Sequence, residues 1–528
     1  MKKIPLYISL SLLLCASACS KFLDTEDVTT ATEQNFYKTP GDAYKALVGC
    51  YDGLQAVWKD GMALPVAAEL MSDNTFGGTG TSDGFGYQMV DEFDKTRSPS
   101  DQNMYNANWI NYYKALYRCN MLLSKMDGIE WKDEALRKTY ESEARFLRAY
   151  MYFDMVRLWE NIPLIIIPTT DNVPQNSADE VYKQIAEDLQ YAAANLPATS
   201  YTAQPVATHG RVTKWAAEAL LARVFLYYTG YYAKADLVGV VSKAQALSSL
   251  EDVISNGAFG LLDNFAHLWP AAGLNNYAGE DNKETVFAIK YTYTSDYDGN
   301  QDGNHWMIMF GMRDQSVYPY GNGWGGCTVN PKLWNAYSAT DTRRVASIIS
   351  ITDEKIKDET KKGQREYTGY YNKKYAPMSD SAGKSMAEKL GGTNLMIGQY
   401  QDYVSIRYAD VLLMAAELGS ANAQKHFDDV RKRAYGASFT ALPVSTDNLF
   451  TERRLEFALE GIRYWDLLRQ GVQTAANTIA ETTNVQNGGV SASKTIQAAK
   501  IVETKGLQQV PYTQINLSSN VLKQNAGW

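Results

Sequence analysis

Glu452, Glu456 and Glu460 are the most regular set of reactive side chains in the sequence, because they recur every four residues among arginines. Two opposed carboxylates could serve as the acid and the base of a hydrolytic reaction. Residues four apart share one face of a helix, however, and carboxylates alternating with arginines are typical of ion-paired helices. The row therefore predicts a helix tied to its neighbours by salt bridges, and no catalytic pair can be distinguished in it.

Patterns for a nucleophile, a phosphate site or a metal centre are incomplete. Residues 80–84 match the G-x-S-x-G pattern of a nucleophilic serine, but the sequence predicts no apolar strand before them and no helix after them. Residues 383–385 resemble the end of a phosphate-binding loop, with Met378 where its first glycine is needed. Metal-ligand spacing is missing from the four histidines, which are His209, His267, His305 and His426. We therefore expect no catalytic residues and no cofactor.

A short acidic turn matches the first half of a calcium-binding loop. It spans residues 298–303, but Met309 occupies the twelfth position, where a bidentate glutamate belongs. A weak calcium site and a solvated turn are both open interpretations. The solvated turn is favoured, so we expect no metal.

The most unusual stretch is residues 291–326, where aromatic rings alternate with seven glycines. So many turn-forming residues argue against a helix and predict an irregular loop. Loops on a rigid scaffold often carry function, and a flat ring face packs well against the C–H face of a sugar. The rings are Tyr291, Tyr293, Tyr297, Trp306, Phe310, Tyr318, Tyr320 and Trp324. The cluster predicts a recognition surface, although half of these rings could instead fill the core.

The composition also favours a globular binding protein. Of the 528 residues, 45% are apolar and 21% are charged, which is typical of a folded chain. A net charge of −8 argues against nucleic acid as a partner, because neutralising phosphates requires a basic surface. The 36 tyrosines and 11 tryptophans provide more ring surface than a core alone requires.

The N-terminus indicates export and a lipid anchor. Two lysines precede a short apolar run and three small residues, the pattern of a secretory signal and not of a spanning helix. Residues 16–19 resemble a bacterial lipobox, so we expect a signal peptide over residues 1–18 and lipid attachment at Cys19. A secreted protein cut after Ala18 is the alternative. Residues 19–32 are polar and lack periodicity, which predicts a tether.

Amphipathic helices account for most of the remaining chain, because apolar residues recur three or four positions apart. Repeated pairs of long helices joined by short turns predict helix-hairpin stacking of the tetratricopeptide type. The expected helices span residues 103–126, 133–159, 177–195, 211–232, 242–254, 406–418, 423–433 and 448–470. Strands are expected within residues 285–294 and 370–375, and loops at residues 73–99 and 473–500.

Several segments together resemble the SusD/RagB family of outer-membrane nutrient-binding lipoproteins. They are CSKFLD at 19–24, ELMSD at 69–73, EARFLRAY at 143–150, RYADVLL at 407–413, ERRLEF at 452–457 and QNAGW at 524–528. Small departures from the family pattern occur at Thr342, Ala526 and Trp528. These motifs span nearly the whole chain, so the resemblance bears on the entire fold.

The resemblance implies a mostly α-helical fold with tetratricopeptide-like helix hairpins and an irregular, loop-rich region with minor β structure. We expect a single domain over residues 33–528. Its helical scaffold would span about 33–260 and 404–528, and its irregular ligand-binding region about 261–403.

The resemblance further implies a surface-exposed protein, anchored by lipid in the outer membrane, that captures a glycan and passes it to a SusC-like TonB-dependent transporter. In this family the ligand lies in an aromatic arc, which here corresponds to residues 76–97 and 306–324. Trp306 and Trp324 are the expected main stacking surface. The full set of expected glycan contacts is Trp306, Trp324, Tyr318, Tyr320, Phe85, Tyr87, Arg97, Asp73 and Asn74.

Two other functions stay open. A RagB-like member would bind peptides through backbone pairing and charge. A glycoside hydrolase would need two opposed carboxylates in a cleft, and the sequence offers no distinguishable pair.

Overall fold

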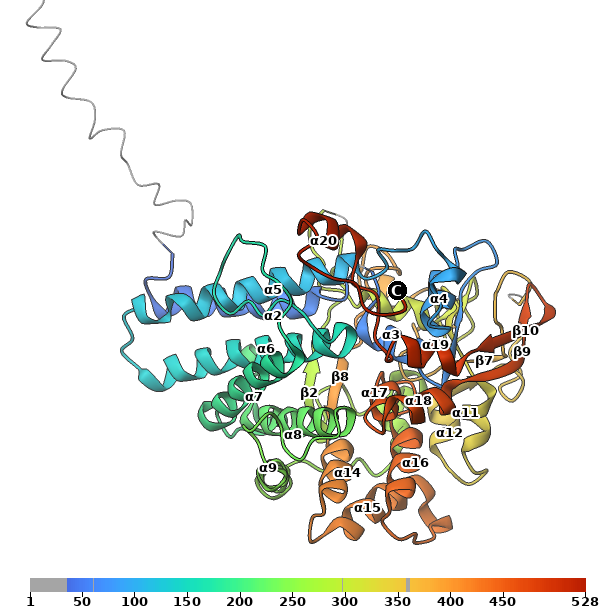
Figure 1. The fold of residues 1–528 in the computed structure, drawn as a ribbon. Coiled ribbons are helices and arrows are strands. Elements are labelled where there is room, and N and C mark those ends of the chain that lie inside the picture. The colour runs from blue at the N-terminus through green and yellow to red at the C-terminus, as the bar shows by residue number, and fades with distance from the viewer. Residues whose placement is uncertain (1–35, 60, 297, 358–360) are drawn as a thin grey trace, which may run out of the picture.

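Long antiparallel helices form the first half of the chain in the computed structural model. The structure describes residues 36–59, 61–296, 298–357 and 361–528, so the predicted signal peptide, Cys19 and the tether lie outside it. Consecutive helices pack against one another along this half, and Figure 1 shows them side by side. This arrangement confirms the predicted helix hairpins. The helices are α2 (Pro40–Ala56), α5 (Asn106–Lys125), α6 (Glu134–Trp159), α7 (Ala178–Asn195), α8 (Lys214–Tyr231) and α9 (Lys243–Asn256).

Side-chain caps fix where several of these helices begin. Thr39 and Asp42 form a capping box at α2, and Ser177 and Glu180 form the predicted one at α7. Each box satisfies two backbone N–H groups that would otherwise lack a partner in the first turn. The starts of α2 and α7 are therefore set by local contacts.

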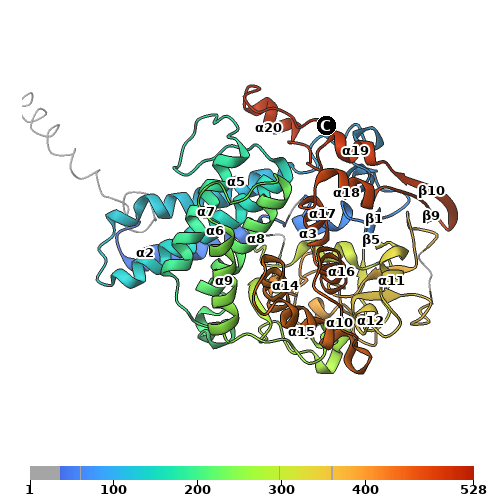
Figure 2. The same ribbon diagram turned by 60° about the horizontal axis from the view of Figure 1, so that its bottom comes forward.

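Shorter helices form the second half and the connections between the two halves. α14 packs against α9 and continues the helix stack into the C-terminal half (Figure 2). Those that follow β8 in the chain are α14 (Tyr408–Leu418), α15 (Ala423–Tyr435), α16 (Thr446–Glu456), α17 (Arg463–Leu468), α18 (Val472–Ile479), α19 (Ala498–Glu503) and α20 (Tyr512–Leu517). Those earlier in the chain are α3 (Leu64–Leu70), α4 (Gly86–Asp91), α10 (Pro270–Gly273), α11 (Pro331–Ala336), α12 (Arg343–Ser347) and α13 (Met386–Lys389).

Strands pair only two at a time within the described residues. β2 (Thr285–Ile289) and β8 (Tyr403–Arg407) run antiparallel between the helical stack and the C-terminal half (Figure 1). The other antiparallel pairs are β1 (Thr75–Gly78) with β5 (Gly326–Val329), β6 (Ile348–Ser350) with β7 (Tyr370–Asn372), and β9 (Glu481–Asn487) with β10 (Val490–Ile496). β3 (Met312–Arg313) and β4 (Asn322–Gly323) form a short parallel pair. The predicted strands within residues 285–294 and 370–375 are thus present but shorter.

Three predicted segments differ in the structure. The helix expected over residues 448–470 breaks between α16 and α17, where Leu459 and Gly461 adopt left-handed φ angles of 65° and 75°. The loop expected over residues 473–500 instead contains α18, the β9–β10 hairpin and the start of α19. The loop expected over residues 73–99 contains β1 and α4.

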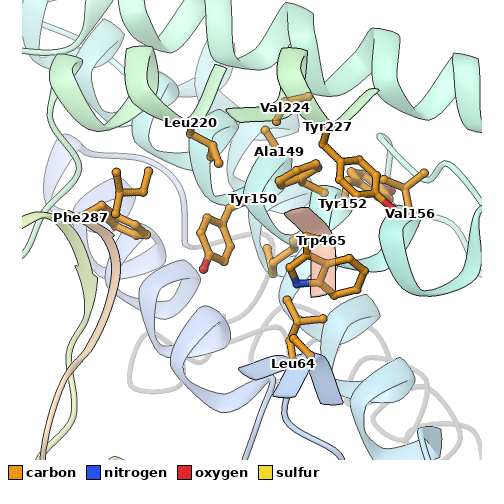
Figure 3. Packing of buried hydrophobic residues seen from close by; sticks show 14 of the residues in the cluster. Leu64, Ala149, Tyr150, Tyr152, Val156, Leu220, Val224, Tyr227, Phe287 and Trp465 are labelled. Carbon is orange, nitrogen blue, oxygen red and sulfur yellow. The ribbon is translucent and has the colours of Figure 1, made fainter. Parts of the chain in front are cut away.

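The hydrophobic core runs through the centre of the molecule, where both halves contribute rings. Trp465 of α17 lies between Leu64 and Tyr227 in Figure 3, and its ring centroid is 6.1 Å from that of Tyr227. Tyr150 of α6 and Phe287 of β2 also pack edge to face, 5.6 Å apart. The helical stack is thereby joined to the region that follows it.

The acidic row forms salt bridges as predicted, but its carboxylates are buried and most of their partners come from other elements. Arg343 of α12 contacts Glu452 at 2.5 Å and Glu456 at 3.0 Å, and Arg407 of β8 contacts Glu456 at 2.9 Å and Glu460 at 2.8 Å. The further cationic partners of the row are Lys374, Arg431 and Arg433. The row is a structural ion network at the centre of the C-terminal half.

A candidate ligand-binding cleft

Strand pairing brings together the two loops that the sequence singled out. In the β1–β5 ladder, Phe76 lies opposite Thr328 and Gly78 opposite Gly326. Beyond the ladder, the backbone N–H of Thr79 donates to the Gly325 carbonyl at 2.8 Å. The chain after β1 and the chain before β5 therefore share one surface.

A cavity of about 500 Å³ lies on this surface. We call it the Trp324 cleft, and its volume is in the range usual for small-molecule sites. It is lined by Thr79, Asp83, Gly84, Gly86, Tyr87, Asp101, Met104, Arg313, Asp314, Trp324 and Met396. Two of the nine expected glycan contacts, Tyr87 and Trp324, line it directly.

Trp324 has a hydrogen-bonded backbone and an exposed side chain. Its N–H donates to the Ile308 carbonyl at 2.9 Å, and its carbonyl accepts from Nη1 of Arg313 at 3.3 Å. Its side chain nevertheless remains 41% exposed. An indole face held at the wall of a cleft is suited to stacking on an apolar ligand face.

The charges of the cleft are mainly negative. Nη1 of Arg313 lies 3.2 Å from Asp83, and its Nε lies 3.5 Å from Asp314. Asp83 also accepts the Gly80 N–H at 2.7 Å. A Cβ on Gly80 would meet Nη2 of Arg313 at 2.3 Å, so this approach of the guanidinium requires glycine. With Asp101, the lining holds three carboxylates and one guanidinium, which is already paired.

Phe85 is exposed at the edge of this region, but cations already lie over its ring. The guanidinium carbon of Arg365 is 3.9 Å from the ring centroid, and that of Arg97 is 5.1 Å away. Arg365 also donates to the carbonyls of Asp83 and Gly84 at 2.9 Å each. A sugar would have to compete with these cations for the ring, so Phe85 holds the loop in place more readily than it stacks on a ligand.

Tyr87 lines the cleft and is only partly exposed. Burial, with smaller effects of Cys327 and Asp83, raises the pKa of Tyr87 to about 12. The hydroxyl therefore stays protonated at neutral pH and can donate or accept a hydrogen bond.

The prediction that Trp306 is an exposed stacking ring is wrong. Trp306 lies in a short 3₁₀ helix, η7 (His305–Phe310), and is only 6% exposed. Its ring packs against Trp58, Tyr403 and Tyr375, with centroids 6.4, 5.6 and 5.4 Å away. The run of apolar residues from 306 to 310 was the sequence signal for this burial.

Three further expected contacts are also buried. Tyr320 donates its hydroxyl to Oε2 of Glu354 at 2.5 Å, and neither residue lines the cleft. Asp73 pairs with Arg463 at 2.8 Å, and Asn74 accepts from Arg454 at 3.1 Å. Tyr320, Asp73 and Asn74 thus already serve internal contacts, and none of them lines the cleft.

Tyr318 and Arg97 are exposed but stand outside the lining of the cleft. Tyr318 is on the same irregular segment as Trp324, and Arg97 pairs with Glu92 at 2.8 Å. Sequence reasoning did not name Asp83 and Arg313, although both lie within the two expected loop ranges. Met396 had no sequence signal at all.

A metal site finds no support in the described part of the chain. No group of three or more His, Cys, Asp or Glu side chains is placed there to hold an ion. In the acidic turn, Asp296 instead accepts the backbone N–H groups of Asp298 and Asn300, at 2.8 and 3.0 Å. Across the same described residues, no helix has the length and apolarity needed to span a membrane.

Comparison with known proteins identifies the class of this chain. Residues 351–528 match the model of the SusD family, and residues 55–226 match a family described as starch-binding associating with outer membrane. SusD-like protein P2 of Formosa agariphila is 28% identical over 492 residues, 87% of this chain and 89% of the relative. A SusD-like protein of Bacteroides ovatus is 24% identical over 490 residues, 89% of this chain and 82% of the relative.

Solved structures agree in fold. A laminarin binding SusD-like protein shares 26% identity and a TM-score of 0.73, covering 93% of this chain and 100% of its own. Surface glycan-binding protein A from Bacteroides thetaiotaomicron, in complex with laminarihexaose, shares 23% identity and a TM-score of 0.74 with the same coverage. The fold is thus that of a helical binding protein with tetratricopeptide-like hairpins. Along most of its length the chain resembles the SusD/RagB family.

Proposed function

We propose that this protein is a cell-surface glycan-binding lipoprotein, and that it captures oligo- or polysaccharide in the Trp324 cleft. The observation that carries the proposal is the exposed Trp324 in the wall of a cavity of about 500 Å³ that Tyr87 also lines. A ring face with hydrogen-bonding groups around it matches the apolar face and the hydroxyl edge of a sugar. The laminarin-binding relative supports the same ligand class.

A non-enzymatic role fits both the comparisons and the site. The relatives whose names state an activity are called binding proteins. Among the lining residues, Asp83 and Asp314 flank one guanidinium, and that ion pairing argues against their acting as a separate acid and base.

We further propose that lipid attachment at Cys19 holds the protein at the outer membrane and that it delivers its ligand to a SusC-like TonB-dependent transporter. Support comes from the lipobox-like sequence and from the family description of association with the outer membrane. Residues 33–528 would act as one binding unit. Its ligand site would use residues near 83 and 101 as well as the irregular region over 261–403.

Affinity electrophoresis tests the proposal directly. Gels containing starch, laminarin, xylan, mannan or pectin are compared, and release of reducing sugar is measured in parallel. We expect retardation by at least one polysaccharide, no sugar release, and loss of retardation in Trp324→Ala. Tyr44→Ala is the matched control, because Tyr44 is 37% exposed on α2 and lies outside the cleft.

The outcomes separate the three candidate functions. Release of reducing sugar would favour a hydrolase. Retardation by none of the polysaccharides, together with binding to a peptide mixture, would favour a RagB-like peptide-binding protein.

A further inference from the structure

A second cavity, of about 610 Å³, lies beside the Trp324 cleft. We call it the C-terminal cavity, because residues near the end of the chain supply much of its wall. Its lining includes the exposed ring of Tyr512, the partly exposed indole of Trp528 and the amide of Gln102. Tyr512 is 50% exposed, so its ring is available to a ligand.

Asp101 and the short helix α4 contribute to the lining of both cavities. The short helix α4 contributes Gly86 and Tyr87 to the Trp324 cleft and Met89 to the C-terminal cavity. A Cβ on Gly86 would lie 3.0 Å from Oδ2 of Asp101, so the missing side chain lets the carboxylate lie close to the helix. In Figure 1 the C-terminus is drawn next to α4.

Asp101, which lines both cavities, closes a tight turn that begins at Ser98. The backbone N–H of Asp101 donates to the Ser98 carbonyl at 3.0 Å, and the Ser98 hydroxyl donates to Oδ2 of Asp101 at 2.7 Å. Because Asp101 lines both cavities, a ligand long enough to reach past this residue would contact both of them.

The C-terminal side of the groove is held rigidly against this turn. The N–H of Tyr512 donates to the Gln102 carbonyl at 3.0 Å, and the N–H of Thr513 donates to Oδ1 of Asn103 at 2.8 Å. The indole N–H of Trp528 donates to the Leu507 carbonyl at 2.9 Å. A backbone fixed by such contacts loses little conformational freedom when a ligand binds.

We infer that the C-terminal cavity is a second glycan subsite, occupied by the same chain that fills the Trp324 cleft. This inference rests on the proposed function. Rings at both ends and amide and carboxylate groups between them suit a ligand with alternating apolar and hydroxyl faces. Once one cavity is filled, the next sugars of the same chain meet the other at high effective concentration, so longer chains bind more tightly.

The test compares ligand length. The polysaccharide that retards the protein most among starch, laminarin, xylan, mannan and pectin is cut to its trisaccharide and to longer oligomers, and each is titrated by calorimetry. For the unmodified protein, affinity should rise beyond the trisaccharide. Tyr512→Ala should weaken the long ligand by roughly tenfold and leave the trisaccharide unchanged, whereas Trp324→Ala weakens both. Tyr512→Phe, which keeps the ring, should retain binding, and Tyr44→Ala is again the control.

The outcomes distinguish this inference from the proposed function. Trisaccharide binding that depends on Trp324, with no gain from longer chains or no effect of Tyr512→Ala, would overturn the second subsite alone. Binding to none of the polysaccharides would overturn both. A thermal melt of each variant identifies loss of affinity caused by unfolding, and the length dependence of the unmodified protein needs no variant.

Discussion

Trp306 and Trp324 show how residues of one type, eighteen positions apart, can serve opposite purposes. Trp306→Ala should lower the free energy of unfolding by about 3–5 kcal/mol, because it empties a space among packed rings. Trp324→Ala should leave stability nearly unchanged and weaken glycan binding by about 1–3 kcal/mol, since its ring is 41% exposed at the cleft. Denaturant unfolding and calorimetry measure the two quantities. If Trp324→Ala is destabilised and binds glycan with unchanged affinity, the Trp324 ring stabilises the fold and does not bind the ligand.

The excess of carboxylates in the Trp324 cleft predicts discrimination against anionic glycans. A carboxymethylated form of the bound polysaccharide should bind more weakly than the neutral parent, because Asp83, Asp101 and Asp314 face it with a single paired Arg313. The difference should shrink as salt increases, since exposed charges are screened. A hydroxyethylated form of similar size is the uncharged control. Equal affinity for the carboxymethylated and hydroxyethylated forms would contradict the prediction.

The sequence predicted which loops meet at the cleft, but not which of their rings are exposed. Trp306 is buried by Trp58, Tyr375 and Tyr403, which lie far away in the chain. The apolar run from 306 to 310 indicated burial but could not identify these partners. Trp324 lies among glycines, whose missing side chains cannot cover an indole, and this local property was readable from the sequence. The exposure of a ring could thus be predicted where it depended only on neighbours in the sequence, as at Trp324.

At the scale of elements, the break between α16 and α17 is held by a buried acid of α3. Oε1 of Glu69 accepts the Gly461 N–H at 2.7 Å, and its other oxygen meets no hydrogen-bond donor among the described residues. Burial raises the pKa of Glu69 from 4.5 to about 8, so the folded protein keeps this proton at neutral pH. A neutral carboxyl is what an isolated buried site favours.

The raised pKa of Glu69 predicts a loss of stability with rising pH. Below pH 4.5 the folded and unfolded chains both hold the proton, so the contribution of this group is fully present. Between about 4.5 and 8 only the folded state holds it, and the free energy of unfolding should fall by up to about 1.4 kcal/mol per pH unit. Glu69→Gln should remove the contribution of this group to the pH dependence. The free energy of unfolding, measured by denaturant at several pH values, should then fall less steeply between pH 4.5 and 8. Parallel curves for the two proteins would show that Glu69 is already ionised.

The buried ion network gives a second prediction at this scale. Arg343 is fully buried and contacts Asp341, Glu452 and Glu456, so Arg343→Ala leaves three carboxylates without their shared cation. A cost of about 3–5 kcal/mol in the free energy of unfolding is expected. The exposed pair of Arg118 with Asp52 is the control, and Arg118→Ala should cost at most about 1 kcal/mol. A similar loss in the free energy of unfolding for both variants would show that the buried network contributes no more to stability than an exposed ion pair.

Helix hairpins could be predicted from periodic apolar residues, whereas the β9–β10 hairpin was missed. Both of its strands are largely polar, and of its side chains only Val485, Lys494 and Ile496 are buried, so no apolar alternation appears. Its one signal was the Gly488-Gly489 pair, whose φ angles of 60° and 81° suit a tight hairpin turn. The prediction of one helix over residues 448–470 was wrong for a different reason. Its apolar spacing continues across the break, which is made by tertiary contacts at Gly461.

At the scale of the whole molecule, attachment and binding should be separable. Cys19→Ala should release the protein from the membrane fraction, because the lipid proposed at Cys19 would be its anchor. Its thermal melt and glycan affinity should be unchanged, since the described fold begins beyond residue 35. Fractionation and lipid labelling provide the measurement. A variant that stays membrane-bound and labelled would show that another residue carries the lipid.

The contact of α20 with the turn near Asp101 also has a consequence for how the protein folds. Thr513 and its partner Asn103 are separated by 410 positions, so this contact closes one of the longest loops in the chain. Contacts between distant residues form slowly, because much chain entropy must be lost first. The helix hairpins, whose contacts are local, should therefore assemble early and the groove last. A glycan can stabilise only the state that binds it, so it should slow unfolding of the mature protein without assisting the early steps of folding.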